Sequence, residues 1–141
     1  MSEYILNFDG SISKNPGGIA ACGFVFKKDG VVYDSMSHKI DGNGPFSNNY
    51  AEFYGAFMGL SYIHLLAQPK DKIFVRGDSQ LAINMLAHKW KSDPLKLYYP
   101  AYEKADNVTK ALRKMGCYVD FGWVPRAFNK EADELSKYNR K

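Results

Sequence analysis

Four acidic side chains in this sequence are placed where they could do chemistry together: Asp9, Glu52, Asp78 and Asp133. Asp9 and Asp78 each end a short apolar segment. If these segments are parallel neighbours in a sheet, their carboxylates meet at its carboxyl end, where open α/β sheets bind ligands. Glu52 lies near the start of a predicted helix, and Asp133 lies one turn into another. Carboxylates that converge repel one another, so the cluster needs protons or cations.

The chemistry of such a cluster is that of a hard divalent cation. Oxygen ligands select Mg²⁺, which keeps part of its water shell and bridges carboxylates to phosphates. Two ions about 4 Å apart can activate a water molecule and stabilise the leaving oxygen of a phosphodiester. The three histidines, His38, His64 and His88, do not adjoin the acids in sequence, which disfavours zinc.

Each acid also has an ordinary structural explanation. An aspartate at a strand end commonly stabilises a turn. An acidic residue in the first turn of a helix, such as Glu52 or Asp133, interacts favourably with the helix dipole. The combination of the four acids and the order of the elements that carry them favour a shared site.

The elements that must position these acids follow from hydrophobic periodicity and turn signals. Strands are predicted over residues 3–9, 20–27, 31–40, 72–77 and 117–124, with a hairpin turn at Lys28-Asp29-Gly30. Helices are predicted over residues 47–66, 79–88, 98–115 and 130–139, the last capped by Asn129. Three antiparallel strands followed by right-handed crossovers give an α/β fold, a mixed five-stranded sheet with helices on its faces.

The helix over residues 47–66 has a face of small residues that includes Glu52, Gly55 and Gly59. Small side chains let a helix approach a sheet closely, which offsets the helix-propensity cost of about 1 kcal/mol for each glycine. A carboxylate on this inward face needs a partner, because unpaired burial is costly.

Composition limits the class of protein. The chain has 141 residues, of which 45% are hydrophobic and 24% charged, which indicates one globular domain over residues 1–141. There is no apolar run of about 20 residues and no signal-like start, so we expect no membrane span and a cytoplasmic location. Cys22 and Cys117 lack metal-site spacing and are expected to be reduced core thiols.

Charge is distributed unevenly. The net charge is +4, but residues 1–83 carry −1 and residues 84–141 carry +5. A basic second half is typical of proteins that bind polyanions. The alternative, which charge alone leaves open, is a solvated surface that favours solubility.

Four motifs occur in the order typical of one family. They are Phe8-Asp9-Gly10-Ser11 with Lys14-Asn15-Pro16-Gly17-Gly18 and Gly23, Ser47-Asn48-Asn49-Tyr50-Ala51-Glu52 with Ala56 and Leu60, Gly77-Asp78-Ser79-Gln80, and Trp123-Val124-Pro125-Arg126 with Asn129-Lys130-Glu131-Ala132-Asp133-Glu134-Leu135. Over nearly its whole length the chain thus resembles the type 1 ribonuclease H family. The resemblance implies a ribonuclease H-like fold and an endoribonuclease that hydrolyses the RNA strand of RNA–DNA hybrids by a two-metal-ion mechanism.

The resemblance also implies roles for individual residues. Two Mg²⁺ ions, or Mn²⁺ in their place, would be held by the four acids. Asp9 and Glu52 would contact both ions or the scissile phosphate, Asp78 one ion and the attacking water, and Asp133 the other ion. Contacts to RNA 2′-hydroxyls and phosphates map onto Asn15, Asn49 and Gln80, with Asn48 assisting. Amide groups both donate and accept, so they can recognise a 2′-hydroxyl without reading a base. Secondary candidates are Gly10, Ser11, Lys89, Trp90 and Arg126.

The amides have structural explanations too, as a turn residue for Asn15 and as helix N-caps for Asn48 and Asn49. Two departures from the family pattern also matter. The loop from Arg126 to Asn129 lacks the histidine of many bacterial members, which resembles the archaeal and plant-like branch and leaves Arg126 or solvent in its place. The segment from His88 to Lys91, with Lys96, is a sparse version of a lysine-rich protrusion that grips the hybrid in some members. Trp90 there would contact a sugar or, as the more ordinary interpretation, pack in the core.

The sequence leaves other functions open. One alternative is a non-catalytic module that binds hybrid or double-stranded RNA, although a binder has no need for all four acids. Transposases, integrases and proofreading exonucleases have a similar sheet and acidic cluster, but they usually need further domains. We expect a monomer that acts on RNA–DNA hybrid, with double-stranded RNA as a second candidate substrate.

Overall fold

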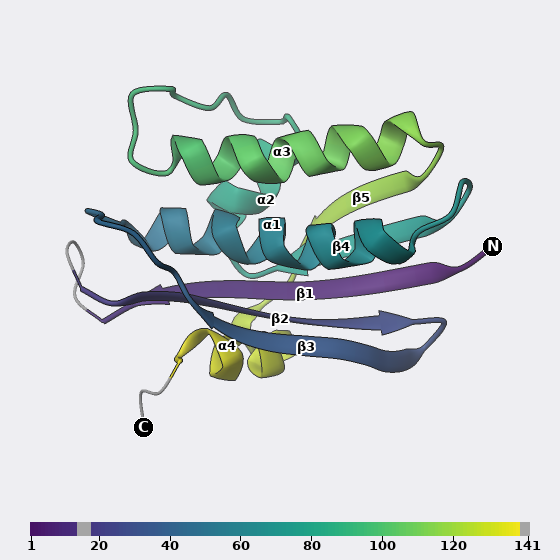
Figure 1. Ribbon diagram of the computed structural model, residues 1–141, viewed down its shortest axis with the longest axis horizontal. Helices are drawn as coiled ribbons and strands as arrows, with labels where there is room; N and C mark the ends of the chain where they lie inside the picture. The colour runs from purple at the N-terminus through teal and green to yellow at the C-terminus, as the bar shows by residue number, and fades with distance from the viewer. Residues whose placement is uncertain (14–17, 139–141) are drawn as a thin grey trace.

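A five-stranded mixed sheet forms the centre of the computed structural model, which describes residues 1–13 and 18–138 (Figure 1). The strands are β1 (Glu3–Ile12), β2 (Ala20–Lys28), β3 (Val31–Lys39), β4 (Lys72–Gly77) and β5 (Tyr118–Trp123). The helices are α1 (Asn48–Leu66), α2 (Gln80–Leu86), α3 (Tyr99–Lys114), the 3-10 helix η1 (Arg126–Phe128) and α4 (Lys130–Ser136). The strand order is β3-β2-β1-β4-β5, with β1, β2 and β3 antiparallel and with β4 parallel to β1 and β5. This architecture confirms the predicted mixed α/β fold.

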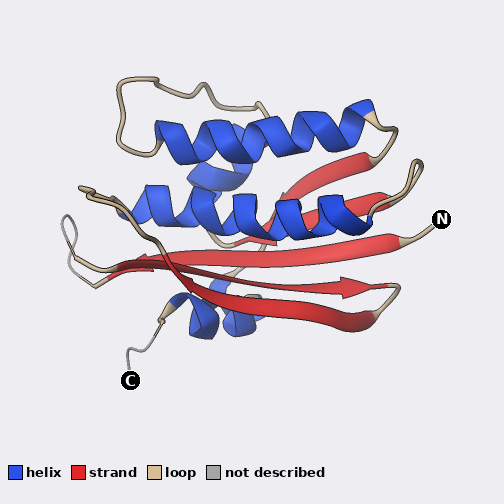
Figure 2. Cartoon of the chain, viewed as in Figure 1, coloured by secondary structure: helices blue, strands red, loops and turns tan. Residues whose placement is uncertain are grey.

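The helices cover the sheet unequally. Helices α1, α2 and α3 lie on one face, and the short α4 lies on the other against β1 and β2 (Figure 2). The core lies between the sheet and the helices α1, α2 and α3, and Tyr4, Leu6 and Phe8 of β1 alternate into it and are fully buried. No helix in the described part of the chain is long and apolar enough to cross a membrane.

Strand β1 is longer than predicted. The prediction ended it at Asp9 before Gly10, whereas the antiparallel ladder with β2 continues through the pairs Gly10–Cys22 and Ile12–Ala20. Gly10 serves close packing here: a Cβ at this position would lie 2.2 Å from the backbone nitrogen of Glu52. The parallel ladder with β4 ends earlier, at the pair of Asn7 with Arg76. Asp9 therefore lies beyond that ladder but inside a continuous strand.

The small residues of α1 let this helix approach β1 closely, as predicted. A Cβ at Gly55 would lie 2.7 Å from the carbonyl oxygen of Asp9, and one at Gly59 would lie 2.5 Å from the Leu6 side chain. The inward face of α1 therefore presses directly on the strand that carries Asp9.

The bounds of β2, β3 and β5 differ from the prediction by one residue, and the larger remaining differences lie at helix ends. Helix α2 ends at Leu86 rather than at residue 88, and His88 adopts a φ of +60°. Helix α4 ends at Ser136, and residue 139 of its predicted range lies outside the described residues. Cys22 and Cys117 are buried free thiols, as expected.

We predict that Gly10→Ala destabilises the fold strongly, because the added methyl group would meet the backbone of α1 at 2.2 Å and the helix would have to move. Overpacking costs about 1–3 kcal/mol in ordinary cores, and we expect at least the upper figure here. Urea unfolding measures the effect. The control is Gly122→Ala in β5, where the three atoms nearest the new Cβ all belong to the Arg76 guanidinium at the end of a flexible side chain. Equal stability of the two variants would contradict the proposed packing.

Candidate active site

Three carboxylates converge at the carboxyl ends of the parallel strands. One oxygen each from Asp9, Glu52 and Asp78 lies within 4.8 Å of the other two. Asp78 directly follows β4, Asp9 lies two residues beyond the last β1–β4 pair, and Glu52 reaches them from the first turns of α1. The structure therefore confirms the prediction that the carboxylates of Asp9 and Asp78 lie close together.

Glu52 is oriented by the strand that it faces. Its Oε1 accepts a hydrogen bond from the backbone N–H of Gly10 at 2.9 Å, while its Oε2 is buried without a hydrogen-bond partner. Oδ2 of Asp78 is also buried and unpartnered. Glu52 is only 5% exposed and Asp9 only 4%. Unpaired buried carboxylate oxygens are costly, so these atoms call for a ligand.

Burial and mutual repulsion perturb the titration of this group. Burial raises the pKa of Asp9 to about 6; Asp78 and Asp133 add to the rise, while Glu52 and the Gly10 N–H lower it in part. Burial also raises the pKa of Glu52 well above its ordinary value, and Asp9 beside it raises it further. Near neutral pH the cluster therefore holds carboxylates that resist ionisation unless a cation joins them.

The residues present fit a hard divalent cation. All the available donors in the group are carboxylate oxygens, and two of them have no protein partner. Mg²⁺ and Mn²⁺ prefer such ligands, whereas a zinc site usually includes histidine or cysteine.

Asp133 occupies a separate position beside this group. It lies in α4 on the opposite face of the sheet, outside the three-residue cluster, and acts on Asp9 strongly enough to raise the pKa of that carboxyl. Its Oδ2 lies 3.3 Å from Nζ of Lys137 one turn later. The structure thus brings three of the predicted acids tightly together and places the fourth next to one of them.

The predicted amide residues lie around helix starts, except that Asn15 falls outside the described residues. Asn48 and Asn49 begin α1, but the helix cap is Ser47, whose Oγ accepts from the N–H of Tyr50 at 3.1 Å. The capping interpretation of the two asparagines is therefore wrong. Gln80 likewise begins α2 behind a serine cap and is exposed.

Among the secondary candidates, Gly10 is buried, Ser11 is half-buried, and Lys89, Trp90 and Arg126 are exposed. Gly10 packs under α1, and Ser11 donates its hydroxyl proton to the carbonyl of Ser136 at 2.6 Å. Arg126 opens η1 and is exposed, as is Lys89.

The core interpretation of Trp90 is wrong. Its side chain is 47% exposed, because α2 ends four residues earlier and the turn at His88 directs the chain outward. Trp90 lines a groove of about 310 Å³ together with His88, Lys91, Ser92 and Tyr102.

Sequence reasoning missed two residues that hold the site together. Trp123 donates its indole N–H to the carbonyl oxygen of Asp78 at 3.0 Å. Asn129 was predicted to cap α4, but its side chain makes no capping bond and instead donates to the carbonyl of Phe8 at 2.9 Å. Both stand inside the fourth motif, yet only three-dimensional contacts reveal their partners.

The raised pKa values predict a stability that depends on pH and on metal. The folded state binds protons more tightly than an unfolded chain whose carboxyl pKa values are near 4. For Asp9 this contribution is fully present below about pH 4 and is lost as the pH rises through about 6 in metal-free protein. For Glu52 the contribution is lost as the pH rises through its own raised pKa.

We therefore expect Glu52→Gln to stabilise the metal-free protein at pH 7.5 by roughly 1–3 kcal/mol, with little effect at pH 4. Urea unfolding in chelator at several pH values measures this difference. Glu103→Gln, an exposed change on α3, is the matched control and should have little effect. A Glu52→Gln variant that is less stable than wild type at pH 7.5 would refute the claim of an unfavourable buried charge.

Comparisons with known proteins find relatives over nearly the whole chain. A family model described as reverse transcriptase-like matches residues 7–139. The bifunctional protein Rv2228c of Mycobacterium tuberculosis is 28% identical over 137 residues, and an uncharacterized protein of Mycobacterium bovis, Mb2253c, matches equally. These matches cover 95% of this chain but 34% of the relatives, so the chain spans about a third of their length.

Solved structures share the same architecture. The N-terminal RNase H domain of Rv2228c superposes with a TM-score of 0.79 at 28% identity, covering 96% of this chain and 91% of that domain. RNase H1 of the archaeon Halobacterium salinarum gives a TM-score of 0.74 at 28% identity, covering 94% of this chain and 93% of that one. LC11-RNase H1, solved in complex with an RNA/DNA hybrid, has the same fold with a TM-score of 0.79 at 24% identity, over 94% of this chain and 92% of that one.

Proposed function

Because the chain belongs to the reverse transcriptase-like family of ribonuclease H-like domains, we propose that it is a metal-dependent endoribonuclease that cleaves the RNA strand of RNA–DNA hybrids. The observation that carries the proposal is the pair of buried, unpartnered oxygens on Glu52 and Asp78 beside Asp9. Relatives at 28% identity include domains named as RNase H, which supports the same chemistry here.

The proposed mechanism assigns a distinct task to each acid. Asp9, Glu52 and Asp78 would hold one part of a two-cation site, and Asp133 beside Asp9 would complete the other. When bound, Mg²⁺ or Mn²⁺ would stabilise negative charge on the scissile phosphate and make a water molecule more acidic. Asp78 is fixed through its carbonyl by Trp123, so its free carboxylate oxygen is available to orient the attacking water. The Gly10 N–H fixes the Glu52 side chain directly, through the hydrogen bond to Oε1.

Substrate recognition is proposed to use the amide side chains at the helix starts. Serines cap both α1 and α2, so Asn48, Asn49 and Gln80 are not needed as caps and can contact the RNA strand. Asn49 also lines a groove of about 500 Å³ with Lys96 and Tyr98. Asn15 is proposed as a further contact on resemblance alone.

A phosphate contact is proposed for the exposed Lys89, and a sugar contact for the exposed Trp90. The +5 charge of residues 84–141 would add sequence-independent attraction to the hybrid. Binding should therefore weaken as salt rises. No histidine stands between residues 126 and 133, so Arg126 or solvent would assist proton transfer and product release.

Asp78→Asn tests the catalytic proposal. We expect wild type to cut the RNA strand of a labelled hybrid in Mg²⁺. The cleavage rate of the variant should fall by at least about 1,000-fold, because the change removes a carboxylate that would hold the charge-stabilising cation. Double-stranded RNA and a nicked DNA duplex serve as comparison substrates.

Asp34→Asn, an exposed change on β3, is the control and should cut normally. Hybrid that binds wild type but stays intact in both Mg²⁺ and Mn²⁺ would favour the non-catalytic module. Cleavage of the DNA duplex would point to the transposase-like chemistry.

Asn49→Ala tests the recognition proposal. Loss of one hydrogen bond to a neutral group costs about 0.5–1.5 kcal/mol, so we expect KM for the hybrid to rise roughly 3- to 10-fold with a smaller change in kcat. Steady-state kinetics at fixed salt measures both. Asn107→Ala, an exposed amide removed from α3, provides the control. Unchanged KM in Asn49→Ala would remove this residue from the substrate contacts.

A further inference from the structure

Asn129 joins the two elements that carry Asp9 and Asp133. It is 2% exposed, and its Nδ2 donates to the carbonyl oxygen of Phe8, the residue before Asp9, at 2.9 Å. Its own backbone carbonyl accepts the N–H of Asp133 at 3.0 Å. A single residue thus connects the backbone next to one acid, through its side chain, with the first turn that holds the other, through its backbone carbonyl.

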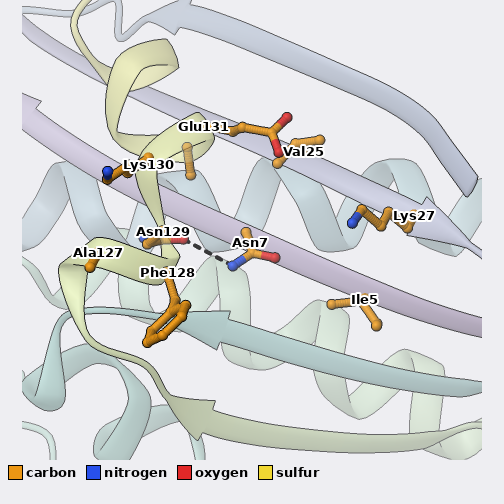
Figure 3. A pocket seen from close by; sticks show the side chains of 10 residues that line it. Ile5, Asn7, Val25, Lys27, Ala127, Phe128, Asn129, Lys130 and Glu131 are labelled. Atoms are coloured by element: carbon orange, nitrogen blue, oxygen red, sulfur yellow. Dashed lines mark hydrogen bonds between the residues drawn. The ribbon is translucent and has the colours of Figure 1, made fainter. Parts of the chain in front are cut away.

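A second bond fixes the direction of this side chain. Oδ1 of Asn129 accepts from Nδ2 of Asn7 at 3.1 Å, drawn as the dashed line in Figure 3. The parallel β1–β4 ladder ends at Asn7, and the next carbonyl along β1, that of Phe8, is bonded by Asn129. Asn129 therefore occupies the place that the neighbouring strand has left.

In this arrangement the Asn129 side chain does not cap α4. An asparagine before a helix usually bonds an N–H of the first turn, which stabilises the helix by about 1 kcal/mol. Here that bond is absent from a helix of seven residues, which is too short to be stable alone.

The far end of α4 is held separately by hydroxyl groups of the sheet. Ser11 donates to the carbonyl of Ser136, and Ser37 donates to that of Leu135. These bonds hold the end of the helix that follows Asp133. At the start of the helix, the bond from Asn129 to the Phe8 carbonyl joins the turn that carries Asp133 to the residue before Asp9.

We propose that Asn129 is a positioning residue that holds Asp133 beside Asp9 so that the two acids can share a cation. The proposal rests on the proposed function for its catalytic consequence, but not for its structural one. Residues that orient metal ligands typically change metal affinity or activity by roughly 10–100-fold when they are replaced.

Asn129→Ala tests the proposal in the full chain. Well below its melting temperature, the variant should lose roughly 10–100-fold in kcat and need more Mg²⁺ for half-maximal cleavage, with little change in KM for the hybrid. The double variant with Asp133→Asn should be no slower than Asp133→Asn alone, because both changes remove the same function. Additive losses would overturn the positioning role.

Metal binding without substrate provides the readout that does not depend on cleavage. Mn²⁺ added to the free protein should raise the melting temperature less in Asn129→Ala than in wild type. Thr109→Val is the matched control, since it removes the buried hydroxyl bond to the Ala105 carbonyl in α3, a helix that carries none of the four acids. It should lower the melting temperature while leaving the Mn²⁺-induced rise unchanged. An equal rise in Asn129→Ala and wild type would reduce Asn129 to a structural residue.

Two further variants separate the two hydrogen bonds. Asn129→Asp can still accept from Asn7 but cannot donate to Phe8, and it should be impaired as Asn129→Ala is. Asn7→Val removes only the other bond and should retain clearly more activity than Asn129→Ala. The reverse order would overturn the assignment. A wild type that binds Mn²⁺ but cuts no hybrid would contradict the proposed function and still leave the Mn²⁺ comparison to decide the role of Asn129.

Discussion

Burial of like-charged carboxylates at one edge of the sheet is the constraint on which this structure depends. Asp9 and Glu52 are almost inaccessible to solvent, and their pKa values rise because water is excluded and the neighbouring groups carry the same charge. Such an arrangement destabilises a metal-free protein near neutral pH. A divalent cation reverses this effect, since it supplies the positive charge that the described residues around the cluster do not.

The packing around the cluster follows from that constraint. Glycines in β1 and α1 let the helix backbone contact the strand. This contact brings the Glu52 carboxylate within hydrogen-bond distance of the Gly10 N–H. The strand β4 diverges from β1 after Asn7, which makes room for Asp78 on one side and for Asn129 on the other. Rigid backbone contacts and short hydrogen bonds therefore set the distances between the acids, as a metal site requires.

Much of this could be predicted from the sequence, for identifiable reasons. The hydrophobic alternation of the strands and the glycine turn at Gly30 fixed the element order, and the four motifs indicated the family to which the chain belongs. Local sequence signals gave wrong predictions where contacts between distant parts of the chain determine the role of a residue. Gly10 was taken for the end of a strand although its role is close packing, and Asn129 for a cap although its partner lies 121 residues away. For Trp90 the more ordinary interpretation, packing in the core, was wrong because an exposed turn carries this residue.

Anomalous diffraction from crystals of the protein soaked in Mn²⁺ tests the cation-binding cluster most directly. The expected result is a strong peak coordinated by carboxylate oxygens of Asp9, Glu52 and Asp78, at metal–oxygen distances of about 2.0–2.3 Å. A second peak between Asp9 and Asp133 would agree with the proposed two-cation site. Mn²⁺ bound only elsewhere, with these three carboxyl groups hydrogen-bonded to one another through retained protons at pH 7.5, would contradict it.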